Sequence, residues 1–177
     1  MNREPQAKLM GELDRPGLPW QTSQDHESRA AIKWLPIVNL TQARIHLGLS
    51  PNASWVRGTQ QSATVFQAGK PCVFLLPVLE VGLDELRRLL EQGLQARGLS
   101  IEFLQAFPFE DVAATGLESH SEHWAGLALK WAEQLPISMK FQSALKVLKT
   151  NGPTQSIRQA AQRLLARQGR PDRKGGI

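Results

Sequence analysis

The sequence predicts a mixed α/β fold of the α+β class: a small sheet with one βαβ unit and a hairpin, followed by a C-terminal layer of about three helices. Two observations predict this class. Short runs of β-forming residues lie before position 80, and apolar residues at helical spacing dominate after position 119. With 41% hydrophobic and 21% charged residues, the 177-residue chain has an ordinary globular composition, which excludes a wholly disordered chain.

Residues 1–30 are predicted to be a mobile N-terminal arm, with at most a short helix over Ala7–Leu13. The segment is polar and is interrupted by three prolines, so it buries too little apolar surface to offset the entropy of ordering. We expect a single mixed α/β domain over 31–168, and a disordered basic tail over 169–177.

Three segments of the domain have the composition of strands. Ile32–Leu40 is rich in β-formers, and Pro36 restricts it to a sheet edge or a bulge. Ser62–Gln67 alternates between polar and apolar residues, and Cys72–Leu79 is continuously apolar, as in a strand buried on both faces. The link over 68–71 suits a hairpin between these two segments.

The βαβ unit is predicted over Cys72–Leu79, Leu83–Arg97 and Ser100–Phe107. Five leucines of the middle segment fall on one helical face, and Gly98 suits the position after the helix end. Three further helices are predicted over 119–135, 138–149 and 154–168; the last two are the basic C-terminal helices of the domain, separated by a Gly-Pro turn.

The net charge of +5 is concentrated at one end of the chain. Residues 137–177 hold nine basic side chains and one acidic one, whereas residues 1–136 hold twelve basic and fifteen acidic ones. A cationic end can bind a polyanion, or it can fold onto the acidic middle of its own chain. Both interpretations remain open from the sequence.

The usual marks of an enzyme are missing from the sequence. It contains no G-x-G-x-x-G, no G-x-x-x-x-G-K-[S/T] and no G-x-S-x-G motif. The single cysteine, Cys72, allows no intramolecular disulfide, and its apolar surroundings favour a core residue over a nucleophile. We therefore assign no catalytic residue and no cofactor.

The sequence contains two sets of possible metal ligands. His120 and His123 share a helical face, but no further ligands complete the four that structural zinc takes, so we assign no metal. Glu80, Glu110 and Asp111 follow the predicted parallel strands, where carboxylates would converge and hold Mg²⁺. A small metal-dependent enzyme at this edge of the sheet is thus one alternative function.

Thr41–Arg57 has the spacing of a helix-turn-helix. Ser50 suits the N-cap and Pro51 the first position of a second helix, which would present Asn52 and Arg57 to a DNA groove. We expect these two residues to be outlying candidates for base contact. The alternative is an ordinary helix and turn leading into the sheet.

The same segment resembles the first half of small excisionase-like or MerR-like DNA-binding modules. The winged version of these modules continues into a hairpin, for which Ser62–Leu79 is the candidate here. The segment departs from the pattern at Arg44 and His46, where those modules favour small or apolar residues. The resemblance implies DNA binding and covers roughly 40 residues.

The last helix carries the clearest binding signal. Arg163, Arg167 and Arg170 recur at i, i+4 and i+7 and form a ridge beside the apolar stripe, while glutamines cover the outer face. The alternative is that this ridge pairs with acids earlier in the chain, at Glu118, Glu122 and Glu133. The predicted phosphate contacts are Lys146, Lys149, Arg158, Arg163, Arg167 and Arg170.

These observations predict a cytoplasmic, non-enzymatic nucleic-acid-binding or accessory protein, bacterial-like in its compactness, with DNA favoured over RNA. A helix-turn-helix with the final helix as its reader is compatible with the tight turn. The other alternative is an adaptor whose basic end docks on an acidic protein. We expect no membrane partner, because the longest apolar run, Cys72–Leu79, is far shorter than the roughly 20 residues of a membrane span.

Overall fold

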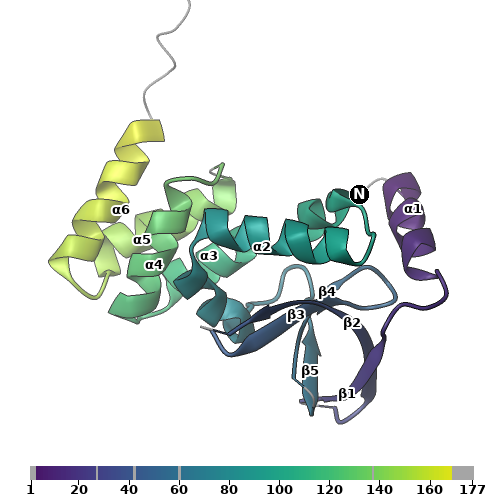
Figure 1. Cartoon of the computed structure of the whole chain (residues 1–177). Coiled ribbons are helices and arrows are strands. Elements are labelled where there is room, and N and C mark those ends of the chain that lie inside the picture. The colour runs from purple at the N-terminus through teal and green to yellow at the C-terminus, as the bar shows by residue number, and fades with distance from the viewer. Residues whose placement is uncertain (1–2, 27, 42, 60, 137, 169–177) are drawn as a thin grey trace, which may run out of the picture. The chain divides into compact units, whose positions relative to one another are not determined.

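The computed structural model of the chain describes residues 3–26, 28–41, 43–59, 61–136 and 138–168, with the backbone alone at 3–7 and 168. The fold is of the mixed α+β class, as predicted (Figure 1). The sequence predicts one domain, but the chain divides into two compact units. One contains Met1–Lys70 and Glu80–Pro108, and the other contains Pro71–Leu79 and Phe109–Ile177. The predicted tail lies outside the described residues.

The first unit is built on a closed five-stranded barrel (Figure 1). Each strand is antiparallel to the next in the chain, so the first and fifth strands of this odd-numbered set run in the same direction. The barrel therefore closes through a parallel pair, with Gln24 opposite Ser62 and Asp25 opposite Ala63. Its strands are β1 (Gln21–Asp25), β2 (Ala31–Leu40), β3 (Ile45–Leu49), β4 (Trp55–Gly58) and β5 (Ser62–Val65).

The buried indole of Trp34 fills the barrel interior, which it shares with Val56 and Ala63. Its Nε1 donates to Ser23 Oγ at 3.0 Å, and that hydroxyl donates to the carbonyl oxygen of Thr59 at 2.8 Å. The ring lies so close to β4 that a Cβ added at Gly58 would come within 2.6 Å of it. The ring therefore packs tightly against β4, and its N–H is hydrogen-bonded inside the barrel.

A helical layer packs against the outer face of the barrel. Helix α2 (Leu83–Ala96) buries its leucine face and packs against β2. The two elements approach closely because Gly93 has no side chain, and a Cβ there would clash with Ile37. The 3₁₀ helix η2 (Ile101–Ala106) packs on α2 and accepts a hydrogen bond at the Phe103 carbonyl from Trp55 Nε1. The β-sheet therefore has apolar residues on both faces.

The N-terminal segment differs from the predicted mobile arm. Helix α1 (Arg3–Leu13) is held by Glu12, which accepts from the backbone N–H of Ser100 at 2.7 Å, and an ion pair joins Lys8 to Glu102 at 2.9 Å. Strand β1 completes the barrel. Main-chain pairing and these polar anchors order a segment that has few apolar residues to bury.

The second unit is helical. It contains part of the 3₁₀ helix η1 (Val73–Val81), followed by α3 (Phe109–Glu118), α4 (Glu122–Ala132), α5 (Met139–Asn151) and α6 (Gln155–Gln168). Helix α3 is central: it is buried throughout 112–117 and packs against α4 and α5, while α6 packs against α5 and α4. Gly116 allows the close approach of α4, since a Cβ there would lie 2.8 Å from Ala128 Cβ.

The predicted βαβ unit is wrong, although its helix is present as α2. Both flanking segments, 72–79 and 100–107, form the 3₁₀ helices η1 and η2 instead of strands. Residues 72–79 form a continuous apolar run, which has no periodicity that separates a buried strand from a buried helix. The hairpin over 62–79 is wrong for the same reason, and β5 instead pairs with β4 and β1.

Neither interpretation of residues 41–57, a helix-turn-helix or an ordinary helix and turn, agrees with the structure. This segment forms β3 and β4, joined by a turn in which Ser50 N donates to the Ser54 carbonyl at 2.8 Å and Ala53 adopts a φ of 60°. Ile45, Leu47 and Leu49 are buried at a spacing of two, which is the strand period. Ser50 and the proline after it therefore begin a turn rather than a helix.

The remaining element predictions agree with the structure. Helices occur in the three predicted C-terminal segments, and β2 and β5 occupy the segments predicted at 32–40 and 62–67. The sequence predicts a sheet edge or a bulge at Pro36, and the register between β2 and β3 does shift between Pro36 and Val38.

Candidate nucleic-acid interface

Helices α5 and α6 form a helical hairpin with a three-residue turn. Ser138 caps the start of α5, where its Oγ accepts from Phe141 N at 3.3 Å. At the other end, Gly152 N donates to the Leu148 carbonyl, and a Cβ on Gly152 would lie only 2.5 Å from that oxygen. Thr154 then accepts from Ile157 N, which starts α6. We call residues 139–168 the basic hairpin.

The basic hairpin contains six lysines and arginines and no aspartate or glutamate. Helix α2, with the same length as α6, carries a mixture of both signs, and Arg88 there binds Glu85 with an Nε–Oε2 distance of 2.8 Å. The hairpin is therefore a local excess of positive charge, as the sequence predicts.

Two of the six cations have structural partners. Lys140 forms an ion pair with Asp111 of α3. Burial disfavours the charge of Lys140, but the hydrogen bond to Asp111 and the attraction of nearby negative charges, Asp111 foremost, together outweigh burial and raise the pKa of Lys140. Arg158 donates from Nη1 to the Gly152 carbonyl at 2.6 Å and so caps the end of α5. The predicted phosphate contact at Arg158 thus belongs to a half-buried side chain that stabilises the turn.

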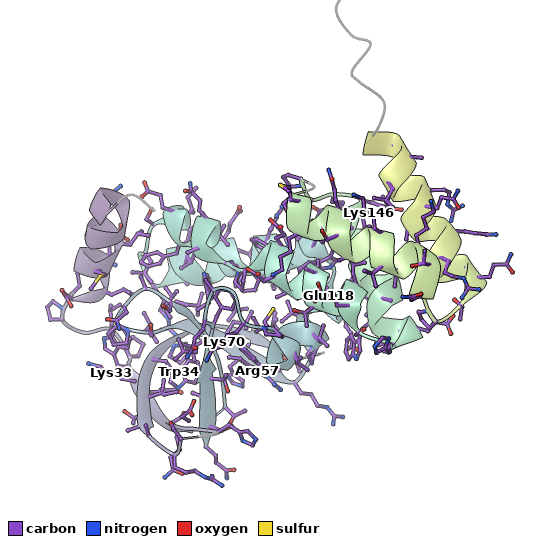
Figure 2. All side chains as sticks on the ribbon, turned by 180° about the vertical axis from the view of Figure 1, so that it is seen from behind. Lys33, Trp34, Arg57, Lys70, Glu118 and Lys146 are labelled. Carbon is purple, nitrogen blue, oxygen red and sulfur yellow. The ribbon has the colours of Figure 1, made fainter. Side chains whose placement is uncertain are left out.

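The other four cations of the hairpin are exposed: Lys146 and Lys149 on α5, and Arg163 and Arg167 on α6 (Lys146 is labelled in Figure 2). Within the part of the chain that the structure describes, none of them forms an ion pair with an acid. The predicted alternative, pairing of the ridge with Glu118, Glu122 and Glu133, is thus not seen among these residues. Arg170, the third member of the predicted ridge, lies outside them.

The outer face of α6 carries three exposed glutamines, Gln155, Gln159 and Gln162. They recur at i, i+4 and i+7, and at 100° per residue they fall within about 60° of one another. The opposite face buries Ile157 and Leu164. The glutamines therefore form one polar stripe that points away from the helical core.

The outlying candidates, Asn52 and Arg57, belong to the barrel unit rather than to the basic hairpin. Asn52 is exposed in the turn between β3 and β4. Arg57 lies on β4, opposite Leu47 and Thr64, and its partial burial lowers its pKa. The structure does not place either of them on a recognition helix.

The carboxylates proposed for a metal site have other roles. Glu110 accepts a hydrogen bond from Ser138 Oγ, and Asp111 binds Lys140, so both anchor the start of α5. Glu80 belongs to the other unit. Throughout the described ranges, no three His, Cys, Asp or Glu side chains gather closely enough to hold a metal ion. The parallel strands on which this site was predicted are the 3₁₀ helices η1 and η2 in the structure.

Cys72 is a buried residue of the helical unit. Its Sγ lies 3.4 Å from Thr115 Oγ1, whose own proton is donated to the Asp111 carbonyl at 2.7 Å, so the thiol is the donor. Burial raises the pKa of Cys72, which lowers the fraction of reactive thiolate. This arrangement suits a packing residue and not a nucleophile.

Comparisons of the chain with protein-family models, with curated proteins and with solved structures find no match. Among the helices that the structure describes, none is both long and apolar enough to cross a membrane. The functional argument therefore rests on the geometry and charge of the basic hairpin.

Proposed function

We propose that the chain is a non-enzymatic nucleic-acid-binding protein that contacts phosphates through the basic hairpin. One observation carries the proposal: Lys146, Lys149, Arg163 and Arg167 are exposed, lack acidic partners among the described residues and share a helical hairpin without an acidic side chain. Lysine and arginine that displace counterions from phosphates supply most of the sequence-independent affinity for nucleic acids.

The proposal predicts a defined dependence on salt. Each phosphate contact on duplex DNA adds about −0.9 to the slope of log K against log salt concentration. Four contacts would therefore give a slope of about −4, and loss of one contact would make the slope shallower by about 1. A surface that binds by shape or apolar contact would show little change with salt.

The test is an anisotropy titration of the full chain with labelled single- and double-stranded oligonucleotides over a salt series. We expect Arg163→Ala and Arg167→Ala each to weaken binding to every sequence and to make the salt slope shallower. Lys130→Ala is the matched control, because it removes one exposed cation of α4 in the same unit. Undiminished binding in the quadruple alanine variant of the hairpin would overturn the proposal.

Substitutions are preferred to truncation after Thr150 for a structural reason. Helix α6 contributes Ile157, Ala161 and Leu164 to the buried core, and it packs against α5 and α4, which its removal would uncover. A truncated chain would lose binding through unfolding as well as through loss of charge. The exposed cations, by contrast, can be replaced without opening the core.

A second candidate function is an adaptor for an acidic protein. It is favoured by two exposed apolar side chains of α5, Met139 and Val147, which are 85% and 57% exposed beside the lysines of the same helix. The purified protein distinguishes the two functions: bound nucleic acid absorbs at 260 nm and is released by salt. An adaptor would instead retain a protein partner that Met139→Ser and Val147→Ser release.

A further inference from the structure

We infer that α5 and α6 form a helix-turn-helix whose second helix reads base edges in the major groove of duplex DNA through Gln155, Gln159 and Gln162. The inference rests on the proposed function and narrows its ligand. It specifies duplex DNA with A·T pairs at defined positions, in place of nucleic acid in general.

The connection between the helices has the required form. Only Gly152, Pro153 and Thr154 separate the end of α5 from the start of α6, and DNA-binding helix pairs are joined by three- or four-residue turns that often contain glycine. Helices α5 and α6 pack against each other on either side of this turn. The turn is fixed on both sides, by the Arg158 bond to Gly152 and by the Thr154 cap.

The packing of the two helices leaves the reading face uncovered among the described residues. Helix α3 packs against α5, and α4 packs against the inner side of α6, with Ile157 Cδ1 close to Gly126. The three glutamines lie opposite this inner side and are exposed. They occupy the first two turns of α6, and the N-terminal part of a recognition helix is the part that contacts base edges.

The chemistry of the stripe suits this role. A glutamine side chain can bind adenine in two places, donating to N7 and accepting from the N6 amino group. Arg163 and Arg167 lie one turn apart beside the stripe, where arginines of a recognition helix would contact phosphates at the rim of the groove. No acidic side chain in residues 139–168 would repel the DNA.

A solvated surface helix of this chain looks different. The exposed face of α2 combines Asp84, Glu85 and Glu91 with Arg88, and an ion pair joins Arg88 to Glu85. On α6 the equivalent face carries neutral amides, with cations to one side. The glutamines would thus face the base edges in the groove, and the arginines would face the phosphates that flank it.

The test is selection of binding sites by the full chain from a pool of random duplexes, followed by titration of the selected site and of a random duplex. We expect a motif with adenines at defined positions. Gln159→Ala should weaken binding to the selected site by about 5- to 150-fold and leave the random duplex nearly unchanged. Gln159→Glu should shift the preference at one position from adenine to cytosine, whose amino group a carboxylate accepts.

Arg163→Ala provides the contrast, because it should weaken binding to the selected site and to the random duplex by the same factor. Selection without a motif, or equal losses on both duplexes in Gln159→Ala, would overturn the inference while the proposed function stands. Tighter binding to RNA or single strands than to the selected duplex would also overturn it. Absence of binding to any nucleic acid would remove the proposed function as well. Far-UV circular dichroism checks that each variant retains its fold.

Discussion

Trp34 shows how a single side chain determines the dimensions of the barrel. Its indole ring spans an interior that five short strands enclose, and two glycines, Gly48 and Gly58, face it where any Cβ would lie within 2.6 Å of the ring. Its one polar atom is bonded to Ser23. Ring size and glycine positions are therefore matched, because protein interiors are close-packed.

Gly58→Ala should destabilise the barrel for this reason. The added methyl group must displace the Trp34 ring, and overpacking of this kind costs about 1–3 kcal/mol. Gly11→Ala is the control, because nothing lies within 4 Å of the added atom, and alanine in a helix is more stable than glycine by about 0.5–1 kcal/mol. Urea unfolding should give a lower free energy of unfolding than the wild type for Gly58→Ala and a higher one for Gly11→Ala. A change in the same direction for both variants would contradict the packing argument.

At the scale of elements, helices were easier to predict than strands. The leucines of α2 repeat at three and four residues, and this period alone identifies a helix with one buried face. The segment 73–81 offers no such period, and its one contrary signal is Pro77, which lacks the N–H that an interior strand must donate. In the turn at 50–54, a serine-proline pair has the same sequence signature as a helix start.

The start of α5 gives a second prediction, at the scale of one helix. Ser138 caps α5 and also donates to Glu110 of α3, so its hydroxyl serves as both acceptor and donor. Asparagine and aspartate normally cap as well as serine does. Here Ser138→Asp places two carboxylates together and loses the donor, whereas Ser138→Asn keeps a donor and adds no charge.

We therefore expect Ser138→Asp to be less stable than Ser138→Asn by about 1 kcal/mol, in line with the value of a single cap. Thermal unfolding followed by circular dichroism measures the difference. Adding Glu110→Gln should remove most of it, since the repelling charge is gone. If Ser138→Asp remained less stable in that background, the contact with Glu110 would not be its cause.

At the scale of the whole molecule, the sequence shows where the positive charge is concentrated. It does not show which lysines and arginines form ion pairs or hydrogen bonds within the protein. Helical spacing predicts that Arg163 and Arg167 share one ridge, and the structure shows that both are exposed, which the sequence left open. Lys140 is occupied by Asp111, which lies 29 residues away on another helix, and local spacing carries no information about that pair. Arg158 was predicted to contact phosphate, but in the structure it donates to the carbonyl of Gly152.

The division into units leads to a prediction about fragments. Residues 71–79 belong to the helical unit although α2 and η2 of the barrel unit follow them in the chain. Leu79 approaches the position of a Cβ at Gly116, and Cys72 is bonded to Thr115. A fragment of residues 109–177 would lack both contacts and the other buried residues of η1.

We expect that fragment to remain helical but to unfold without a sharp transition, with a much lower midpoint than the full chain. Loss of one buried leucine already costs about 2–5 kcal/mol, and several are missing here. Circular dichroism melting curves compare the fragment with the full chain. A cooperative transition at the midpoint of the full chain would show that residues 71–79 are dispensable for the helical unit.

The passage of residues 71–79 into the helical unit also limits how such a gene can be rearranged. The chain changes unit at three places, after residues 70, 79 and 108. A single crossover between two genes therefore cannot transfer either unit whole, because any one breakpoint leaves part of it behind. An end-to-end fusion of two modules would give one change of unit and a single insertion would give two, so neither event alone produces the three changes found here.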